Sequence, residues 1–242
     1  MIKRLVDILA SFFGLLFFSP ILLPAMFLIW KEDKSSPFYV RPRLGKNGKS
    51  FKMIKLRSME VDADKSGVVS SSGSDMRITP IGHKVRKYKL DELIQLWNVL
   101  IGDMSLVGPR PNVKNETDLY TNVEKELFSV RPGITDFSSI VFSDEGDILK
   151  GKDNPDLVYN QLIRPWKSRL GLIYIKNQSF LLDIKMIIYT LVEIFSKQRA
   201  LNWVVSQLKL MNADSNVVSI SKREEELYPF PPPGTDKVVT KR

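Results

Sequence analysis

The chain has 242 residues, of which 43% are hydrophobic, and this is enough for one globular domain with a substantial core. It contains no cysteine and a single histidine, His83, so disulfides, thiolate nucleophiles, cysteine-ligated metals and paired-histidine zinc motifs are excluded. The formal net charge of +9 favours anionic partners such as nucleic acid, phosphorylated ligands or an anionic membrane surface.

Residues 1–34 are predicted to form a membrane anchor. No charged residue occurs between Ile8 and Trp30, and an uninterrupted helix over this run would be about 35 Å long, which is enough to cross a bilayer. A cleaved signal peptide is disfavoured because the apolar run is too long and no small-residue cleavage site follows it. The run therefore predicts a helix in contact with lipid, and a buried core helix is the least favoured alternative.

Prolines and flanking charges indicate how this helix meets the membrane. Pro20 and Pro24 remove backbone donors near the middle of the apolar run, so a bend is expected at the Ser19-Pro20 step. Basic residues flank both ends of the run, and the positive-inside rule places such residues on the cytoplasmic side. A re-entrant helix that bends and returns to the same face satisfies this rule at both ends, and it is favoured over a straight span.

A second segment, residues 35–205, is predicted to form the globular domain. Residues 36–60 contain two short strands that are rich in Lys and Arg, and the turn between them, GKNG at 45–48, suits positive φ angles. A polar, Gly/Ser-rich stretch at 62–76 predicts a loop. Residues 82–101 repeat apolar side chains at helical spacing and predict a helix.

The C-terminal part of the chain gives weaker signals. Residues 163–176 mix aromatic and basic side chains, which suits either a membrane interface or the solvent-facing edge of a helix. Residues 206–242 are polar and proline-rich and predict a flexible tail. The predicted fold class is α+β and mostly helical, with a short β-hairpin in a small domain associated with the membrane interface.

The segment LDELIQLWNVLIGDMSLVGPRP carries the strongest chemical signal. Asp91 and Glu92 follow a basic run at 83–89, and neighbouring side chains on a helix lie about 100° apart, so the two carboxylates can serve different purposes. An isolated acidic pair at a helix start is more often a solvated complement to the helix dipole. Basic groups, an oxygen-ligated metal and an aspartate together suit phosphoryl transfer, in which a carboxylate attacks phosphorus.

Three stretches carry a more specific signal: RPRLGKNGKSFKMIKLRSM at 41–59, RITPIGHKVRKYKLDELIQLWNVLIGDMSLVGPRP at 77–111, and RPGIT at 131–135. Together with the Ser-Pro step near the N-terminus, they resemble the bacterial sugar transferase family, the monotopic polyprenol-phosphate phosphoglycosyl transferases. The resemblance covers roughly residues 1–200 and is to a minimal, single-domain form of the family. It implies transfer of a sugar 1-phosphate from a nucleoside diphosphate sugar, expected to be a UDP-sugar, to undecaprenyl phosphate.

The resemblance also implies roles for individual residues. Asp91 would be the nucleophile that forms a covalent phosphosugar intermediate, and Glu92 would bind Mg²⁺. Ser19 and Pro20 would form the kink of the membrane helix. The implied substrate-binding residues are basic: Arg86, Arg110, Lys55, Arg57 and Arg131.

The resemblance further implies a place in the cell. The protein would lie at the bacterial cytoplasmic membrane with its catalytic domain on the cytoplasmic face, contact membrane lipids, bind no nucleic acid and start the assembly of a surface polysaccharide or lipopolysaccharide. Two alternatives remain open. One is a membrane-anchored basic module that binds anionic lipid or nucleic acid, and the other is a conventional nucleotide-sugar glycosyltransferase.

Overall fold

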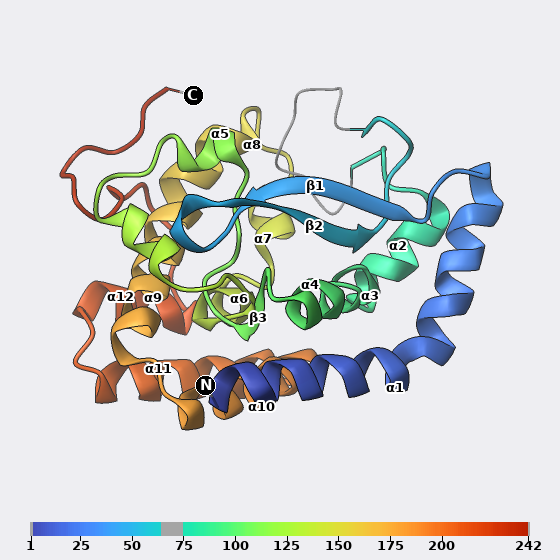
Figure 1. Cartoon of the computed structure of the whole chain (residues 1–242). Helices are drawn as coiled ribbons and strands as arrows, with labels where there is room; N and C mark the ends of the chain where they lie inside the picture. The colour runs from blue at the N-terminus through green and yellow to red at the C-terminus, as the bar shows by residue number, and fades with distance from the viewer. Residues whose placement is uncertain (1, 64–74, 242) are drawn as a thin grey trace.

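The computed structural model describes residues 2–63 and 75–241, so most of the predicted loop at 62–76 lies outside the described residues. In Figure 1 the β-hairpin lies in the upper half, short helices lie below it, and α10, α11 and the first half of α1 run along the bottom. This confirms the prediction of a mostly helical α+β fold with a short antiparallel hairpin. The long helices are α1 (Ile2–Asp33), α9 (Arg164–Asn177), α10 (Phe180–Phe195) and α11 (Lys197–Leu210).

The N-terminal helix α1 is continuous over 32 residues and bends near its middle, so that its second half turns upward along the side of the domain (Figure 1). Pro20 cannot donate to the carbonyl of Leu16, and the hydroxyl of Ser19 donates to that carbonyl at 2.7 Å instead. Of the described helices, α1 alone is long and apolar enough to cross a membrane by length and composition. Most of its apolar side chains are exposed, which agrees with the prediction of a helix in contact with lipid.

The N-terminal end of α1 is fastened to the domain by charged groups. Lys3 forms an ion pair with Asp183 of α10 at 2.6 Å and also donates to the hydroxyl of Tyr174. The carboxylate of Asp7, which is 4% exposed, accepts from the backbone nitrogen of Leu106 at 3.0 Å. Because these charged groups are partly or fully buried and hydrogen-bonded, they stabilise the contact between α1 and the domain more than surface ion pairs would.

The C-terminal end of α1 is fastened as well. Arg57 donates to both carboxylate oxygens of Asp33 and, through Nε, to the carbonyl of Ser36 at 2.8 Å. This pairing holds the pKa of Asp33 down, at about 2. Both ends of α1 therefore lie against the same globular domain.

The hairpin pairs β1 (Phe38–Leu44) with β2 (Ser50–Leu56) in antiparallel register, from Phe38 opposite Leu56 to Leu44 opposite Ser50. In its turn, Asn47 and Gly48 adopt φ angles of 58° and 70°, which confirms the positive φ predicted for the GKNG sequence.

The predicted helix at 82–101 is wrong as a single element. The segment forms three short helices, α2 (Pro80–Lys87), α3 (Leu90–Leu93) and α4 (Leu96–Ile101). Lys89 adopts φ 53°, in the left-handed region, and this stops the helical path between α2 and α3. The break gives α3 a direction different from that of α2.

Two short strands, β3 (Ser105–Val107) and β4 (Gly133–Thr135), pair in parallel. This pairing brings the backbone of Gly133 very close to that of Gly108, which directly follows β3. A Cβ on Gly133 would lie 2.1 Å from the nitrogen of Gly108, and no real contact is that short.

Replacement of Gly133 by Ala is therefore expected to destabilise the protein by at least about 2 kcal/mol, because backbone must shift to admit the methyl group. Thermal unfolding in detergent would measure the change. Gly45→Ala is the matched control. Its Cβ would lie 3.0 Å from the ring of Phe51, a side chain that can shift, and 3.4 Å from the carbonyl oxygen of Lys49, and its φ of −110° suits alanine. Equal stability of the two variants would contradict the prediction.

The main core lies between α9, α10 and α11 and explains two departures from the sequence predictions. Trp166 and Tyr174 are each 1% exposed, so the aromatic residues of 163–176 face neither lipid nor solvent. Part of the predicted tail packs on this core, because Phe230 stacks on Trp166 with ring centroids 4.3 Å apart. The predicted tail begins inside α11 and also contains α12 (Ser215–Lys222).

Short elements complete the described chain. They are α5 (Lys114–Thr117), α6 (Phe137–Val141), α7 (Glu145–Ile148), α8 (Pro155–Val158), two 3₁₀ turns at Lys46–Gly48 and Glu124–Ser129, and a π-helical turn at Tyr159–Ile163.

Candidate active site

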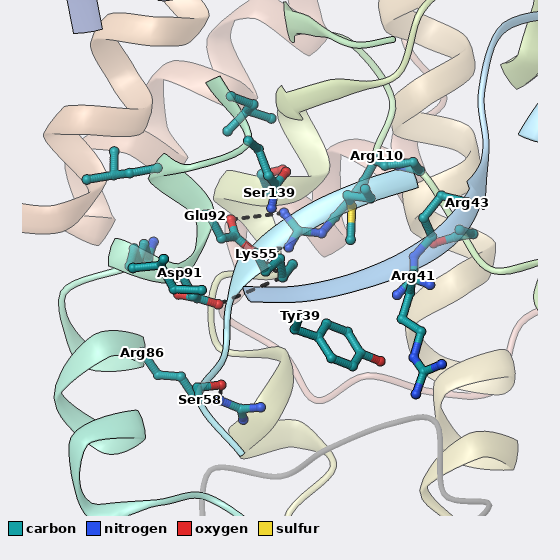
Figure 2. Close-up of a pocket in the computed structure, with 18 of the residues that line it drawn as sticks. Tyr39, Arg41, Arg43, Lys55, Ser58, Arg86, Asp91, Glu92, Arg110 and Ser139 are labelled. Atoms are coloured by element: carbon teal, nitrogen blue, oxygen red, sulfur yellow. Dashed lines mark hydrogen bonds and ion pairs between the residues drawn. The ribbon is translucent and has the colours of Figure 1, made fainter. Parts of the chain in front are cut away.

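The carboxylates of Asp91 and Glu92 lie on α3 and meet cations from two other parts of the chain (Figure 2). Lys55 of β2 places its Nζ 3.0 Å from Glu92 Oε1 and 3.9 Å from Asp91 Oδ2. Arg110, which follows β3, donates to both oxygens of Glu92 through its two terminal nitrogens. Glu92 thus pairs with two cations at hydrogen-bonding distance, whereas Asp91 lies farther from Lys55, at 3.9 Å.

This arrangement drives the pKa values of the two carboxyls apart. Burial raises the pKa of Asp91 above its ordinary value, although Lys55 acts in the opposite direction. Burial acts in the same way on Glu92, but Arg110 and Lys55 outweigh it and hold its pKa well below the ordinary value. Glu92 is therefore a fixed negative charge, and Asp91 is the more basic carboxylate of the pair.

The strand and the helices of this cluster are joined by a buried amide. Asn98 of α4 is 0% exposed, accepts from the backbone nitrogen of Ile54 at 3.0 Å and donates to the carbonyl of Lys52 at 2.7 Å. Because Lys52 and Ile54 come shortly before Lys55 on β2, the Asn98 side chain fixes this part of the strand against the helices. Asn98 is a positioning residue for the cluster, and no pattern in the sequence indicated this role.

A further cation lies on the other side of Asp91. The Nε of Arg86, on α2, donates to the hydroxyl of Ser58 at 2.8 Å, and both residues lie below Asp91 in Figure 2. Arg86 is close enough for its charge to act on Asp91. The break at Lys89 separates α2, which carries Arg86, from α3, which carries Asp91.

These residues line one large cavity with a volume of about 1760 Å³. Pockets that hold one small molecule are usually about 300–1000 Å³, so this cavity has room for more than one substrate. Ten basic and seven acidic side chains line it among the residues that the structure describes. The excess of positive charge suits an anionic ligand such as a diphosphate.

Two of the predicted substrate-binding residues lie apart from this cluster. Arg57 borders the cavity, but its guanidinium is paired with Asp33 at the end of α1. Arg131 does not line the cavity and donates to the carbonyl of Gly102 at the end of α4. Asp91, Glu92, Lys55, Arg86 and Arg110, in contrast, are brought together.

Other residues of the cavity were missed in the sequence. Tyr39, Arg41 and Arg43 alternate along β1 and point into the cavity, and Ser139 of α6 lies beside Arg110 (Figure 2). The alternation of Tyr39, Arg41 and Arg43 at a period of two was a usable signal, since such residues share one face of a strand. Nothing in the sequence around Ser139 marked that residue.

The chain matches the family model described as "Bacterial sugar transferase" over residues 1–197. It is 33% identical over 198 residues to a UDP-N-acetylgalactosamine-undecaprenyl-phosphate N-acetylgalactosaminephosphotransferase of Aeromonas hydrophila, a match that covers 78% of this chain and 43% of that protein. It is 33% identical over 202 residues to a UDP-glucose:undecaprenyl-phosphate glucose-1-phosphate transferase of Klebsiella pneumoniae, covering 82% of this chain and 41% of that protein.

A third relative matches over most of its length. The uncharacterized sugar transferase EpsL of Bacillus subtilis is 34% identical over 189 residues, which cover 78% of this chain and 85% of that protein. The chain spans less than half the length of the Aeromonas and Klebsiella relatives. Because the family model extends from α1 through the carboxylate pair to α10, the chain belongs to the bacterial sugar transferase family.

Proposed function

We propose that this protein transfers a sugar 1-phosphate from a UDP-sugar to undecaprenyl phosphate through a covalent intermediate on Asp91, and that it thereby starts the assembly of a surface glycan. The observation that carries the proposal is the carboxylate pair, in which Asp91 has a raised pKa beside a Glu92 that is neutralised by Arg110 and Lys55. The printed names of the Aeromonas and Klebsiella relatives support a UDP-sugar donor and an undecaprenyl-phosphate acceptor.

In the first step, a carboxylate oxygen of Asp91 attacks the phosphorus that bears the sugar. A bond forms between this oxygen and phosphorus, and the bond from phosphorus to the nucleoside monophosphate breaks. The raised pKa of Asp91 makes its ionised form a better nucleophile than an ordinary aspartate. Arg86, Lys55 and Arg110 neutralise the negative charge that gathers on the phosphate oxygens.

In the second step, a phosphate oxygen of the lipid acceptor attacks the same phosphorus. The new bond gives a lipid diphosphate sugar, and the bond to Asp91 breaks and restores the free carboxylate. No oxidant, reductant or additional proton donor is needed. The size of the cavity supports this sequence, because the covalent phosphosugar and the lipid phosphate must be present together.

The residues of the site fit Mg²⁺. No cluster of three or more metal-ligating side chains occurs in the parts of the chain that are described, but Mg²⁺ usually takes only one or two carboxylates and completes its shell with substrate phosphates and water. Bound Mg²⁺ would neutralise charge on the diphosphate. Glu92, which keeps its negative charge, would hold it, and Arg110 and Lys55 are then available to the phosphate oxygens.

The membrane helix is proposed to be re-entrant, with the domain on the cytoplasmic face of the cytoplasmic membrane. Lys3 and Asp33 tie opposite ends of α1 to the same domain, whereas a straight span would separate these ends by about 30 Å of hydrocarbon. The bend at Ser19-Pro20 also supports a re-entrant helix. The positive residues at both ends favour the cytoplasmic side.

Single cysteines test this topology, because the chain has none of its own. A cysteine that replaces Asp118, which is exposed on the domain, marks the side of the membrane on which the domain lies. Cysteines that replace Ile2 and Lys31 are expected to react with a membrane-impermeant maleimide from that same side only. Reaction of the two ends from opposite sides of the membrane would show that α1 spans it.

The released nucleotide tests the proposed reaction. Detergent-solubilised protein is incubated with Mg²⁺, undecaprenyl phosphate and a panel of UDP-sugars, and the products are separated. Release of UMP is the expected result. Release of UDP would instead identify a conventional glycosyltransferase, and no release with any donor would favour a module that only binds.

A further inference from the structure

We propose that the cavity has a lipid-facing arm that receives the prenyl chain of the acceptor. This inference rests on the proposed function and adds where the lipid lies. We call the region the acceptor arm, and it is lined by three residues of α1 and three of α10: Ala10, Gly14, Phe18, Ile187, Leu191 and Ile194.

The acceptor arm joins the membrane-facing surface to the nucleophile. Its α1 residues are spaced by four and its α10 residues by four and three, so each set shares one face of its helix. The two helices lie along the same lower edge of the domain in Figure 1 and are linked by the Lys3–Asp183 ion pair. At the inner end, Leu93 and Leu96 continue the lining directly after Asp91 and Glu92.

The outer end of the arm is open and apolar. Leu191 and Ile194 are 56% and 58% exposed, and the outward faces of α1 are also covered by exposed apolar side chains. Gly14 contributes no side chain, and a Cβ there would lie 3.0 Å from a methyl group of Leu96. The glycine therefore lets α1 pack closely against α4 at the inner end of the arm.

The chemistry of the lining selects a hydrocarbon chain. A sugar or a nucleotide would need hydrogen-bond partners, because unpaired buried polar groups are costly. Two polar residues of α10 line the cavity, and both already have partners: Thr190 shares its hydroxyl with Thr135 at 2.6 Å, and Glu193 pairs with Lys89. An isoprenoid chain needs no such partner, and its phosphate end would reach the cations around Asp91.

A lysine beside the arm suits that phosphate. The Nζ of Lys89 lies 2.8 Å from a carboxylate oxygen of Glu193 on α10, and both residues line the cavity. Lys89 stands two residues before Asp91 and is half exposed, so it can exchange Glu193 for an incoming phosphate. The lipid phosphate would then attack the phosphorus on Asp91, and the Asp91–phosphorus bond would break as the diphosphate bond forms.

Tryptophan variants with matched controls test the arm. Ala10→Trp and Leu191→Trp fill it, whereas Leu9→Trp and Ile188→Trp add bulk to exposed positions of the same helices outside the cavity. All four variants are expected to form the Asp91 adduct from UDP-sugar within about twofold of the wild-type rate. The two arm variants are expected to discharge the adduct to undecaprenyl phosphate at least tenfold more slowly, and the controls at the wild-type rate.

A prenyl phosphate with a photoreactive group along its chain gives a second measurement that needs no donor sugar. In nanodiscs, the expected cross-links fall on the acceptor-arm faces of α1 and α10, and Ala10→Trp reduces them. Cross-links confined to the outward faces, or arm variants that discharge the adduct normally, would overturn the proposal. Failure of the wild-type protein to form any adduct would instead count against the proposed reaction, and the cross-links would still decide the lipid site.

Discussion

Replacement of Asp91 by Asn is expected to abolish the covalent adduct and to lower turnover by at least about a thousandfold. Asparagine keeps the shape of the side chain but lacks the ionised oxygen that attacks phosphorus. Intact mass spectrometry after incubation with UDP-sugar and Mg²⁺ would detect the phosphosugar on the wild-type protein and its loss in the variant. The rate of UMP release with undecaprenyl phosphate would give the loss in turnover.

The matched control for this experiment is Asp118→Asn. It makes the same chemical change at an exposed carboxylate that pairs with Lys114 and lies outside the cavity. This control is expected to keep the adduct and the turnover of the wild-type protein. An Asp91→Asn variant that turns over normally would show that another group is the nucleophile, or that the sugar phosphate moves without a covalent step.

Replacement of Glu92 by Gln is expected to lower kcat/KM by about a hundredfold to a thousandfold and to raise the Mg²⁺ concentration needed for half-maximal activity. The amide keeps an oxygen ligand but loses the charge that holds the metal and pairs with Arg110 and Lys55. Steady-state rates across a Mg²⁺ series would measure both effects. Glu126→Gln, at an exposed position outside the cavity, is the control.

The same variant has a signature in its pH dependence that general damage would not produce. Burial is the main cause of the raised pKa of Asp91, and the negative charge of Glu92 adds to it. Because Glu92→Gln removes that like charge, the pKa of Asp91 should fall, and adduct formation should persist to lower pH than in the wild-type protein. An acidic limb that moves to higher pH, or does not move, would contradict the coupling of the two carboxyls.

Local patterns in the sequence predicted much of the fold. The apolar run with Pro20 predicted a long apolar helix, and α1 is that helix. The GKNG turn predicted the hairpin, because Asn and Gly tolerate the positive φ angles that such a turn requires. Apolar spacing also predicted helix over 82–101 but could not reveal the break, because the left-handed conformation of Lys89 depends on how α2 and α3 pack.

Burial explains the other failures. The mixed aromatic and basic residues of 163–176 suited a lipid interface or a solvent edge, but Trp166 lies in the core under Phe230 from a segment that was predicted to be a flexible tail. Amphipathic side chains fit all three surroundings, so composition alone could not distinguish them. The contact with the distant C-terminal segment decided between them.

The sequence by itself determined the family of this protein, the adjacent carboxylates and the apolar N-terminal helix, because each is written in a contiguous stretch of residues. Only the tertiary structure decided which cations serve the carboxylates. It brings Lys55 from 37 residues before Glu92 and Arg110 from 18 residues after it, while Arg57 is bound to the end of α1. It also set the two pKa values apart, since burial and the distances between charges exist only once these remote segments pack together.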